Sequence, residues 1–259
     1  MKKFLSEAFD AYRKYRNFKK QNRAYKIFRY ALTGIFAAYF LTLVFPQYLF
    51  AHEVSHKNFK VYARQPLDEN INHVLDLAEE RLVKSPIYNK EITERIFISD
   101  TFAFYTFQYP LSRKSFASTL PGIGNIRINK ADVAGDLVFR DSQTDNQRSL
   151  SGVIAHEVTH NLIRKKFGLI NSFASLPNWK DEGYCEYVAG DGTLSFEEGS
   201  RRWKENPNND SKYAYFKYHQ MVKYLLDVEK ISVEELFNKD FDKQELEAKV
   251  FELIINGKG

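Results

Sequence analysis

The sequence predicts an α+β domain that follows one apolar segment near the N-terminus. Three observations predict this class. Short runs rich in β-branched and aromatic residues fall between residues 95 and 139. Amphipathic stretches with helical spacing dominate from about residue 150 onward. Strands that come first and helices that come after are typical of an α+β fold, so we expect the functional centre where the two halves meet.

The positive charge of the chain is concentrated at its N-terminus. Residues 1–29 contain ten Lys/Arg against Glu7 and Asp10, a net charge of +8, whereas the whole chain carries +5, so the remainder carries −3. Cations confined to a tail argue against a nucleic-acid partner. The single cysteine, Cys185, excludes an intrachain disulfide framework and a cysteine-rich metal module, so histidine and carboxylate are the expected ligands of any metal.

Residues 30–51 contain no charged residue in 22 positions. At 1.5 Å per residue such a helix spans about 30 Å, the hydrocarbon thickness of a bilayer. We interpret the segment as a signal anchor. A buried soluble helix is one alternative, and a cleaved signal peptide is another, although the preceding region is long and no A-x-A-like cleavage site follows. Positive-inside orientation puts residues 1–29 in the cytoplasm and the domain outside it, on the periplasmic side of a bacterial inner membrane, with the lipid bilayer as a partner.

The expected elements follow in chain order after this transmembrane segment. Residues 52–67 are predicted to form a juxtamembrane linker with an extended piece at residues 58–63, and residues 68–259 the extracytoplasmic domain. A helix is predicted from Asp68, a good N-cap, to Lys84, because apolar residues recur along one side. The predicted strands are residues 95–99, 102–107, 125–129 and 136–139.

The pentapeptide H-E-x-x-H occurs twice, as HEVSH at residues 52–56 and as HEVTH at residues 156–160. On a helix its two histidines lie one turn apart and can share a Zn²⁺ ion, with the glutamate as base. Only the second copy has a helical frame, with Ser149 or Ser151 as N-cap and Gly168 after the last apolar residue. We therefore expect the first copy to bind no metal.

A second helix, predicted to begin near Asp181, offers two carboxylates. Glu182 and Glu186 are four residues apart, so both face the same way. We interpret Glu182 as the third metal ligand and Glu186 as the acceptor that orients a histidine N–H, while the reverse assignment stays open.

HEVTH followed by W-x-x-E-G-x-x-E-Y at residues 179–187 resembles the gluzincin zinc metallopeptidases, the group that contains thermolysin and the membrane alanyl aminopeptidases. The resemblance covers roughly residues 95–240. It implies a zincin-like fold, Zn²⁺ as cofactor and a peptide or protein as substrate. It also aligns Glu182 with the family's third ligand, Glu186 with the carboxylate four residues later, and Tyr215 with the tyrosine that stabilises the transition state.

The chemistry implied is peptide hydrolysis by a zinc-activated water. Zn²⁺ on His156, His160 and a carboxylate lowers the pKa of its bound water toward 7, and Glu157 is the expected general base. Tyr215 or His219, one helical turn apart, is the expected donor to the oxyanion.

The predicted strand at residues 125–129 is a candidate edge strand for an extended peptide. An inactive membrane-anchored scaffold is the alternative function. The aminopeptidase G-x-M-E-N loop is absent, so the sequence leaves endopeptidase and exopeptidase action open, along with the substrate and the oligomeric state.

Overall fold

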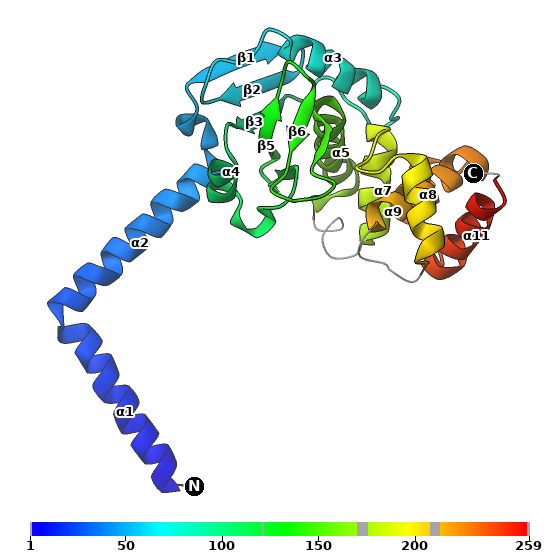
Figure 1. The fold of residues 1–259 in the computed structure, drawn as a ribbon. Helices are drawn as coiled ribbons and strands as arrows, with labels where there is room; N and C mark the ends of the chain where they lie inside the picture. Colours follow the sequence, from blue (N-terminus) through cyan, green and yellow to red (C-terminus); the bar gives the residue numbers. More distant parts are fainter. Residues whose placement is uncertain (1, 121, 170–175, 208–212, 258–259) are drawn as a thin grey trace. The chain divides into compact units, whose positions relative to one another are not determined.

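The computed structural model describes residues 2–120, 122–169, 176–207 and 213–257. It consists of two units, Met1–Tyr48 and Leu49–Gly259. In the first unit, α1 (Lys2–Gln21) is followed by α2 (Arg23–Val44) (Figure 1). Asn22 caps α2, because its side-chain oxygen accepts a hydrogen bond of 3.0 Å from the backbone N–H of Tyr25.

The helix α2 is long and apolar enough to cross a membrane or to act as a signal sequence. Its position differs from the predicted segment, residues 30–51, since the helix begins at Arg23 and ends at Val44. Pro46 explains the earlier end. Proline disfavours the helical conformation of the residue before it, and Phe45 accordingly has φ −119° and ψ 60°. A short 3₁₀ turn, η1 (Pro46–Leu49), follows.

The second unit contains a mixed sheet with the strand order β1-β2-β3-β5-β6-β7, and β4 pairs with β5. The strands are β1 (His52–His56), β2 (Phe59–Ala63), β3 (Glu94–Ser99), β4 (Ala117–Thr119), β5 (Asn125–Asp132), β6 (Leu137–Phe139) and β7 (Gln147–Ser149). The pairs β2–β3 and β3–β5 are parallel, and the other pairs are antiparallel. Residues 52–63, expected in a linker, thus form β1 and β2 of this sheet.

Helices form the C-terminal half of this unit, which confirms the predicted α+β class at this level (Figure 1). The helices of the unit are α3 (Ile71–Leu82) and α4 (Phe102–Gln108) in its first half, followed by α5 (Leu150–Phe167), α7 (Asn178–Ala189), α8 (Phe196–Glu205), α9 (Ala214–Lys223), α10 (Val233–Asn238) and α11 (Lys243–Ile255), with short helical turns η2 (Pro110–Ser112) and η3 (Tyr224–Val228). The N-cap of α3 is Asn70, whereas Asp68, the predicted cap, accepts a hydrogen bond of 2.9 Å from the Asn70 N–H.

The two faces of the sheet have different neighbours, because successive side chains of a strand point to opposite faces. Ile96 and Ile98 of β3 lie in the hydrophobic core that includes residues of α3 and α5. Phe97 points the other way and stacks on Tyr62, with the ring centroids 4.8 Å apart. On that face Phe104 of α4 packs near β3 and β5. Only the α5 face leads to the site described below.

The strand predicted at residues 102–107 is wrong, because this stretch forms α4. Thr101 caps the helix by accepting a hydrogen bond of 3.2 Å from the Phe104 N–H. Tyr105 and Gln108 are its buried residues, and their spacing of three fits a helix. The aromatic residues that favoured the strand prediction thus belong to a short helix with one buried side.

The predicted edge strand at residues 125–129 is also wrong in its position, although the strand exists. It belongs to β5, which pairs with β3 on one side and with β4 and β6 on the other. The short strand β4 is an edge strand beside β5, as β1 and β7 are at the two ends of the sheet, since no strand in the described parts of the chain pairs with its second side. Residues 117–119 gave too short a run to stand out in the sequence.

Candidate metal site

The helix α5 carries HEVTH and has the predicted boundaries. Ser149 is its N-cap and accepts a hydrogen bond of 2.9 Å from the Gly152 N–H, while Gly168 ends it with φ 89°. All residues from Leu150 to Ile163 are buried. The pentapeptide therefore lies inside the domain, with α3 and α7 packed against its helix.

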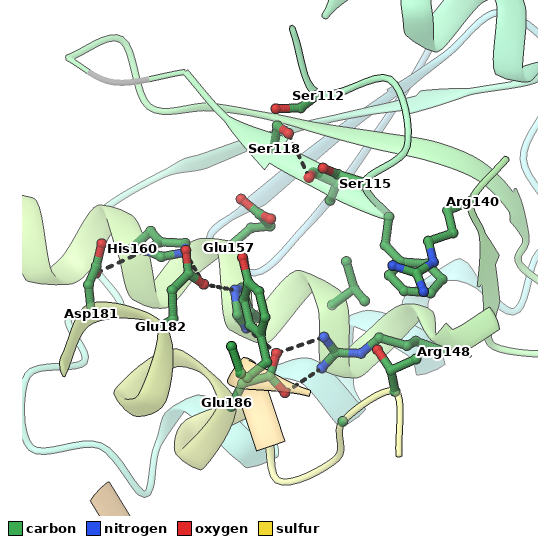
Figure 2. Close-up of a pocket in the computed structure, with 18 of the residues that line it drawn as sticks. Ser112, Ser115, Ser118, Arg140, Arg148, Glu157, His160, Asp181, Glu182 and Glu186 are labelled. Atoms are coloured by element: carbon green, nitrogen blue, oxygen red, sulfur yellow. Dashed lines mark hydrogen bonds and ion pairs between the residues drawn. The ribbon is translucent and has the colours of Figure 1, made fainter. Parts of the chain in front are cut away.

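Three side-chain atoms converge where α5 meets α7 (Figure 2). The Nε2 atom of His156 lies 3.3 Å from Oε2 of Glu182, and Nε2 of His160 lies 3.5 Å from the same oxygen. Within the described residues this buried oxygen has no hydrogen-bond partner. Two imidazole nitrogens and an unsatisfied carboxylate oxygen form a donor set that suits Zn²⁺. The chemistry of these residues fits the metal.

The other nitrogen of each imidazole faces a second carboxylate. Nδ1 of His156 lies 3.1 Å from Oε1 of Glu186, and Nδ1 of His160 lies 3.0 Å from Oδ1 of Asp181. A proton on Nδ1 directed at a carboxylate fixes the tautomer and leaves Nε2 as the metal-binding atom. The contact of His160 is a hydrogen bond, whereas the contact of His156 with Glu186 is an ion-pair distance without hydrogen-bond geometry.

Arg148 of β7 holds Glu186 in this outer position. Its guanidinium donates two hydrogen bonds to the carboxylate, at 2.8 and 3.1 Å, and a third of 2.7 Å to the Asp191 carbonyl. Burial alone would raise the pKa of Glu186, but Arg148 and His156 more than offset it and lower the pKa to about 2. Both oxygens of Glu186 are therefore engaged by Arg148, whereas Oε2 of Glu182 faces the two histidine Nε2 atoms.

The carboxylates also change the proton affinity of the imidazoles. Burial would lower the pKa of His156, but Glu182 and Glu186 raise it to about 9. The pKa of His160 is raised too: burial opposes this, and Cys185, Asp181 and Glu182 outweigh it. Protons therefore compete with a metal for these nitrogens.

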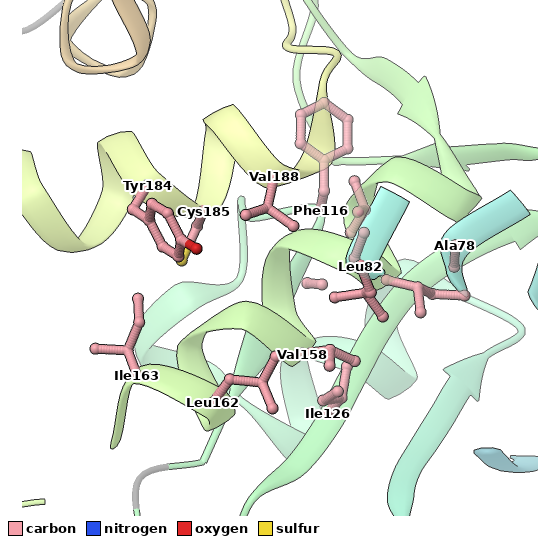
Figure 3. Packing of buried hydrophobic residues seen from close by; sticks show 14 of the residues in the cluster. Ala78, Leu82, Phe116, Ile126, Val158, Leu162, Ile163, Tyr184, Cys185 and Val188 are labelled. Atoms are coloured by element: carbon pink, nitrogen blue, oxygen red, sulfur yellow. The ribbon is translucent and has the colours of Figure 1, made fainter. Parts of the chain in front are cut away.

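Cys185 introduces a second possible ligand set, which the sequence interpretation excluded. Ligand atoms of His156, His160 and Cys185 lie within 4.8 Å of one another and could hold a metal ion. Figure 3 shows Cys185 on α7 among core side chains such as Val158 and Leu162, and the residue is fully buried. Burial raises the pKa of its thiol, which opposes the thiolate that a metal needs.

Two substitutions on α7 distinguish the ligand sets. We expect Cys185→Ala to retain zinc, and Glu182→Gln to lose more affinity than the roughly 10–100-fold typical of an outer carboxylate such as Glu186. Zinc content and a competition titration with a chromophoric chelator would measure this. Loss of zinc from Cys185→Ala together with its retention by Glu182→Gln would assign the metal to the thiol set.

Gly183 brings α9 close to α7. A Cβ atom at this position would lie 2.6 Å from the Tyr218 carbonyl oxygen and 2.7 Å from Cγ2 of Val222. Without a side chain at Gly183, the helix carrying Tyr215 and His219 can approach the helix carrying the carboxylates. The glycine of the D-E-G-Y-C stretch is thus required by packing.

We expect Gly183→Ala to destabilise the domain by about 1–3 kcal/mol, the usual cost of overpacking a core. For a domain of this size the melting temperature should fall by about 2–4 °C per kcal/mol. Thermal unfolding followed by circular dichroism would test this, with the exposed change Lys204→Ala as control. An unchanged melting temperature in Gly183→Ala would contradict the close packing.

A cavity of about 770 Å³ opens beside the converging ligands. Glu157, Tyr215 and His219 all line it, as do residues of β4. The ring centroid of Tyr215 is 6.4 Å from that of His156, whereas the ring contact of His219 is with Tyr187. The ring of Tyr215 thus lies near a histidine of the pentapeptide, and His219 lies one turn farther along α9.

The two candidate donors on α9 are in protonation states that suit donation. Desolvation and the nearby Glu182 carboxylate raise the pKa of Tyr215, so its phenol keeps its proton. Desolvation lowers the pKa of His219, so a neutral ring that still carries one N–H is favoured.

The carboxylate of Glu157 makes a hydrogen bond outside the group formed by His156, His160 and Glu182. Thr119 of β4 donates from Oγ1 to Oε2 of Glu157 at 2.6 Å, and the glutamate is buried. The hydroxyl contact connects the edge strand to the pentapeptide. No sequence pattern points to this role for Thr119, since it depends on β4 packing against α5.

The first pentapeptide is in a different environment. HEVSH forms β1, and His56 Nε2 lies 2.7 Å from Asp76 Oδ1. Residues four apart on a strand are separated by about 13 Å, compared with about 6 Å along a helix. His52 and His56 therefore cannot share one ion, and they lie outside the candidate metal group.

The site so defined is a buried His-His group that could hold a metal, beside a cleft lined by a glutamate and an edge strand. No protein-family model matches the chain, and no curated protein sequence matches it at a significant level. The site itself is therefore the basis for an inference of function.

Proposed function

We propose that the chain is a membrane-anchored, zinc-dependent metallopeptidase of the gluzincin type. The convergence of His156 Nε2, His160 Nε2 and Glu182 Oε2, next to Glu157 in an open cleft, carries this proposal. A purely structural ion would need a closed ligand shell, whereas a cleft beside three protein ligands leaves room for water and substrate. His156, His160 and Glu182 are the proposed ligands.

A bound zinc ion would supply polarisation of the peptide carbonyl and acidification of a water molecule. Glu157 would act as the general base that takes a proton from the attacking water and passes it to the leaving amine. Thr119 orients Glu157 by donating to one of its oxygens. Tyr215 donates its phenolic hydrogen to the oxygen of the tetrahedral intermediate, and His219 is the other candidate donor.

The open side of β4 supports a peptide as substrate. The carbonyl of Phe116 and the N–H of Leu120 bond to β5. Backbone groups of an antiparallel strand alternate in direction, so those of Ala117 and Thr119 point away from β5. A strand with a free edge can bind an extended peptide through main-chain hydrogen bonds.

The anchor and the orientation are further parts of the proposal. The helix α2 and the cationic residues around α1 support insertion with the N-terminus in the cytoplasm and the peptidase domain outside it. We propose the second unit, which contains residues 68–259 together with β1 and β2, as the catalytic domain. The lipid bilayer and a peptide or protein are the proposed partners. The acidic remainder of the chain does not favour nucleic acid.

The test uses the full chain in detergent with a generic unfolded protein as substrate. We expect cleavage that stops when a chelator removes the metal and returns when Zn²⁺ is added back. Zinc-loaded protein that cleaves no unfolded protein would support the alternative, a scaffold without turnover. Fragment analysis by mass spectrometry would then separate internal from terminal cleavage.

A further inference from the structure

Arg140, directly after β6, lines the same cleft as the metal site (Figure 2). Its guanidinium carbon lies 4.9 Å from the centre of the Phe116 ring, and it is partly buried. Its Nε atom is buried and has no hydrogen-bond partner among the described residues. Desolvation lowers the pKa of Arg140 and the charge of Arg148 adds to this shift, while the charge of Asp145 only partly opposes it. A cation in this position is not fully compensated by its own protein.

Two charged residues that line the cleft near Arg140, namely Arg148 and Asp145, have partners of their own. Arg148 is held by Glu186 at 2.8 Å. Asp145 accepts hydrogen bonds of 3.0 and 3.2 Å from Arg202. In the described part of the chain, no carboxylate lies within 4.0 Å of the Arg140 guanidinium. Burying an unpaired charge is unfavourable, so a carboxylate supplied by a ligand would be stabilised there.

Arg140 contacts Phe116, the residue just before β4, and β4 connects this point with Glu157. Thr119 bonds Glu157 at one end of this strand, and Phe116, under Arg140, lies three residues earlier. At about 3.3 Å per residue these points are about 10 Å apart. A peptide on the free edge of β4 would pair most stably in the antiparallel sense. Arg140 would then face residues on the C-terminal side of the bond to be cleaved.

We propose that Arg140 forms a carboxylate-binding subsite two or three residues to the C-terminal side of the scissile bond. The carboxylate belongs to an Asp or Glu side chain, or to the C-terminus of a short peptide. This subsite adds a substrate preference to the proposed peptidase function, and the proposal rests on that function. The planar guanidinium can bind a carboxylate through two parallel hydrogen bonds, which makes arginine selective for this group.

The experiment compares peptides of one sequence that carry Glu or Gln at the second and third positions after the bond, each with a free or an amidated C-terminus. For wild-type protein we expect kcat/KM to be about 10–100-fold higher with a carboxylate, as for hydrogen bonds to charged groups. In Arg140→Gln this ratio should fall to about 1. Arg140→Lys should keep part of it, and Arg201→Gln, an exposed change on α8, should keep it fully.

The two sources of the carboxylate give different results. A Glu/Gln ratio that collapses in Arg140→Gln assigns the subsite to a side chain, and a free/amidated ratio that collapses assigns it to the C-terminus. A wild-type protein without either preference, or a preference that survives in Arg140→Gln, would overturn the proposal.

Failure of the subsite can be separated from failure of the peptidase function. The same peptides would be titrated into zinc-loaded Glu157→Gln and into Glu157→Gln/Arg140→Gln by calorimetry. We expect Kd to favour carboxylate peptides by about 10–100-fold only when Arg140 is present. If wild-type protein cleaves no peptide, the peptidase function fails, and this Kd ratio alone decides whether Arg140 binds carboxylates.

Discussion

Replacing Glu157 by Gln is expected to remove peptide hydrolysis and to leave zinc bound. A general base of this kind contributes about 10²–10⁴-fold to the rate, and glutamine has the same shape but cannot accept the proton. The proposed ligand atoms belong to His156, His160 and Glu182, so the change removes none of them. Zinc content and cleavage of an unfolded protein would be measured on the same preparation.

A substitution at Thr119 provides a second, milder test of the same mechanism. Thr119→Val removes the hydroxyl that donates to Glu157 at 2.6 Å and keeps the β-branched shape suited to β4. We expect a smaller loss of kcat than in Glu157→Gln, with KM little changed, because the base remains but loses its orientation. Undiminished cleavage by Glu157→Gln would contradict the proposed mechanism, whatever the result for Thr119→Val.

The helical parts of the site could be predicted because their signals are local. The cap at Ser149, the terminal Gly168 and the spacing of Glu182 and Glu186 are all read within one turn or one helix. The helix α7 begins at Asn178, one turn before the predicted start near Asp181, because its first residues carry no strong N-cap. Local patterns therefore predicted which side chains share a helix face more accurately than where each helix begins and ends.

The residues that sequence reasoning missed act across the fold. Arg148, Thr119 and Cys185 reach the site from β7, β4 and the core side of α7, and no spacing in the chain connects them. Asp181 had a weak signal, since it immediately precedes Glu182, but its contact with His160 depends on how α5 and α7 cross. Tertiary packing brings these residues together, and it leaves no recognisable pattern in a single sequence.

The same limit explains the errors in the sheet. Residues 102–107 have the composition of a strand, yet the cap at Thr101 and two buried residues three apart stabilise a helix. The strand at residues 125–129 was recognised, but its neighbours were not, because strand order follows from long-range pairing. Composition therefore gave the existence of β5, whereas only the structure gave the edge position of β4.

The two copies of H-E-x-x-H provide the second large expected effect. Alanine at both His156 and His160 should reduce bound zinc from about one ion per chain to near zero and abolish cleavage, because two of three proposed ligands are lost. Alanine at both His52 and His56 should change neither zinc nor cleavage. The pairs have the same spacing in sequence, so they are matched controls.

The first reason for this difference is backbone geometry. On α5 the rings of His156 and His160 lie with their centroids 4.9 Å apart, whereas His52 and His56 belong to a strand that separates them by about 13 Å. The control pair still has a local contact, since His56 bonds Asp76, so a small loss of stability is expected there. Circular dichroism of both double variants would verify folding. Zinc retained after loss of His156 and His160, in a folded protein, would show that the metal binds elsewhere.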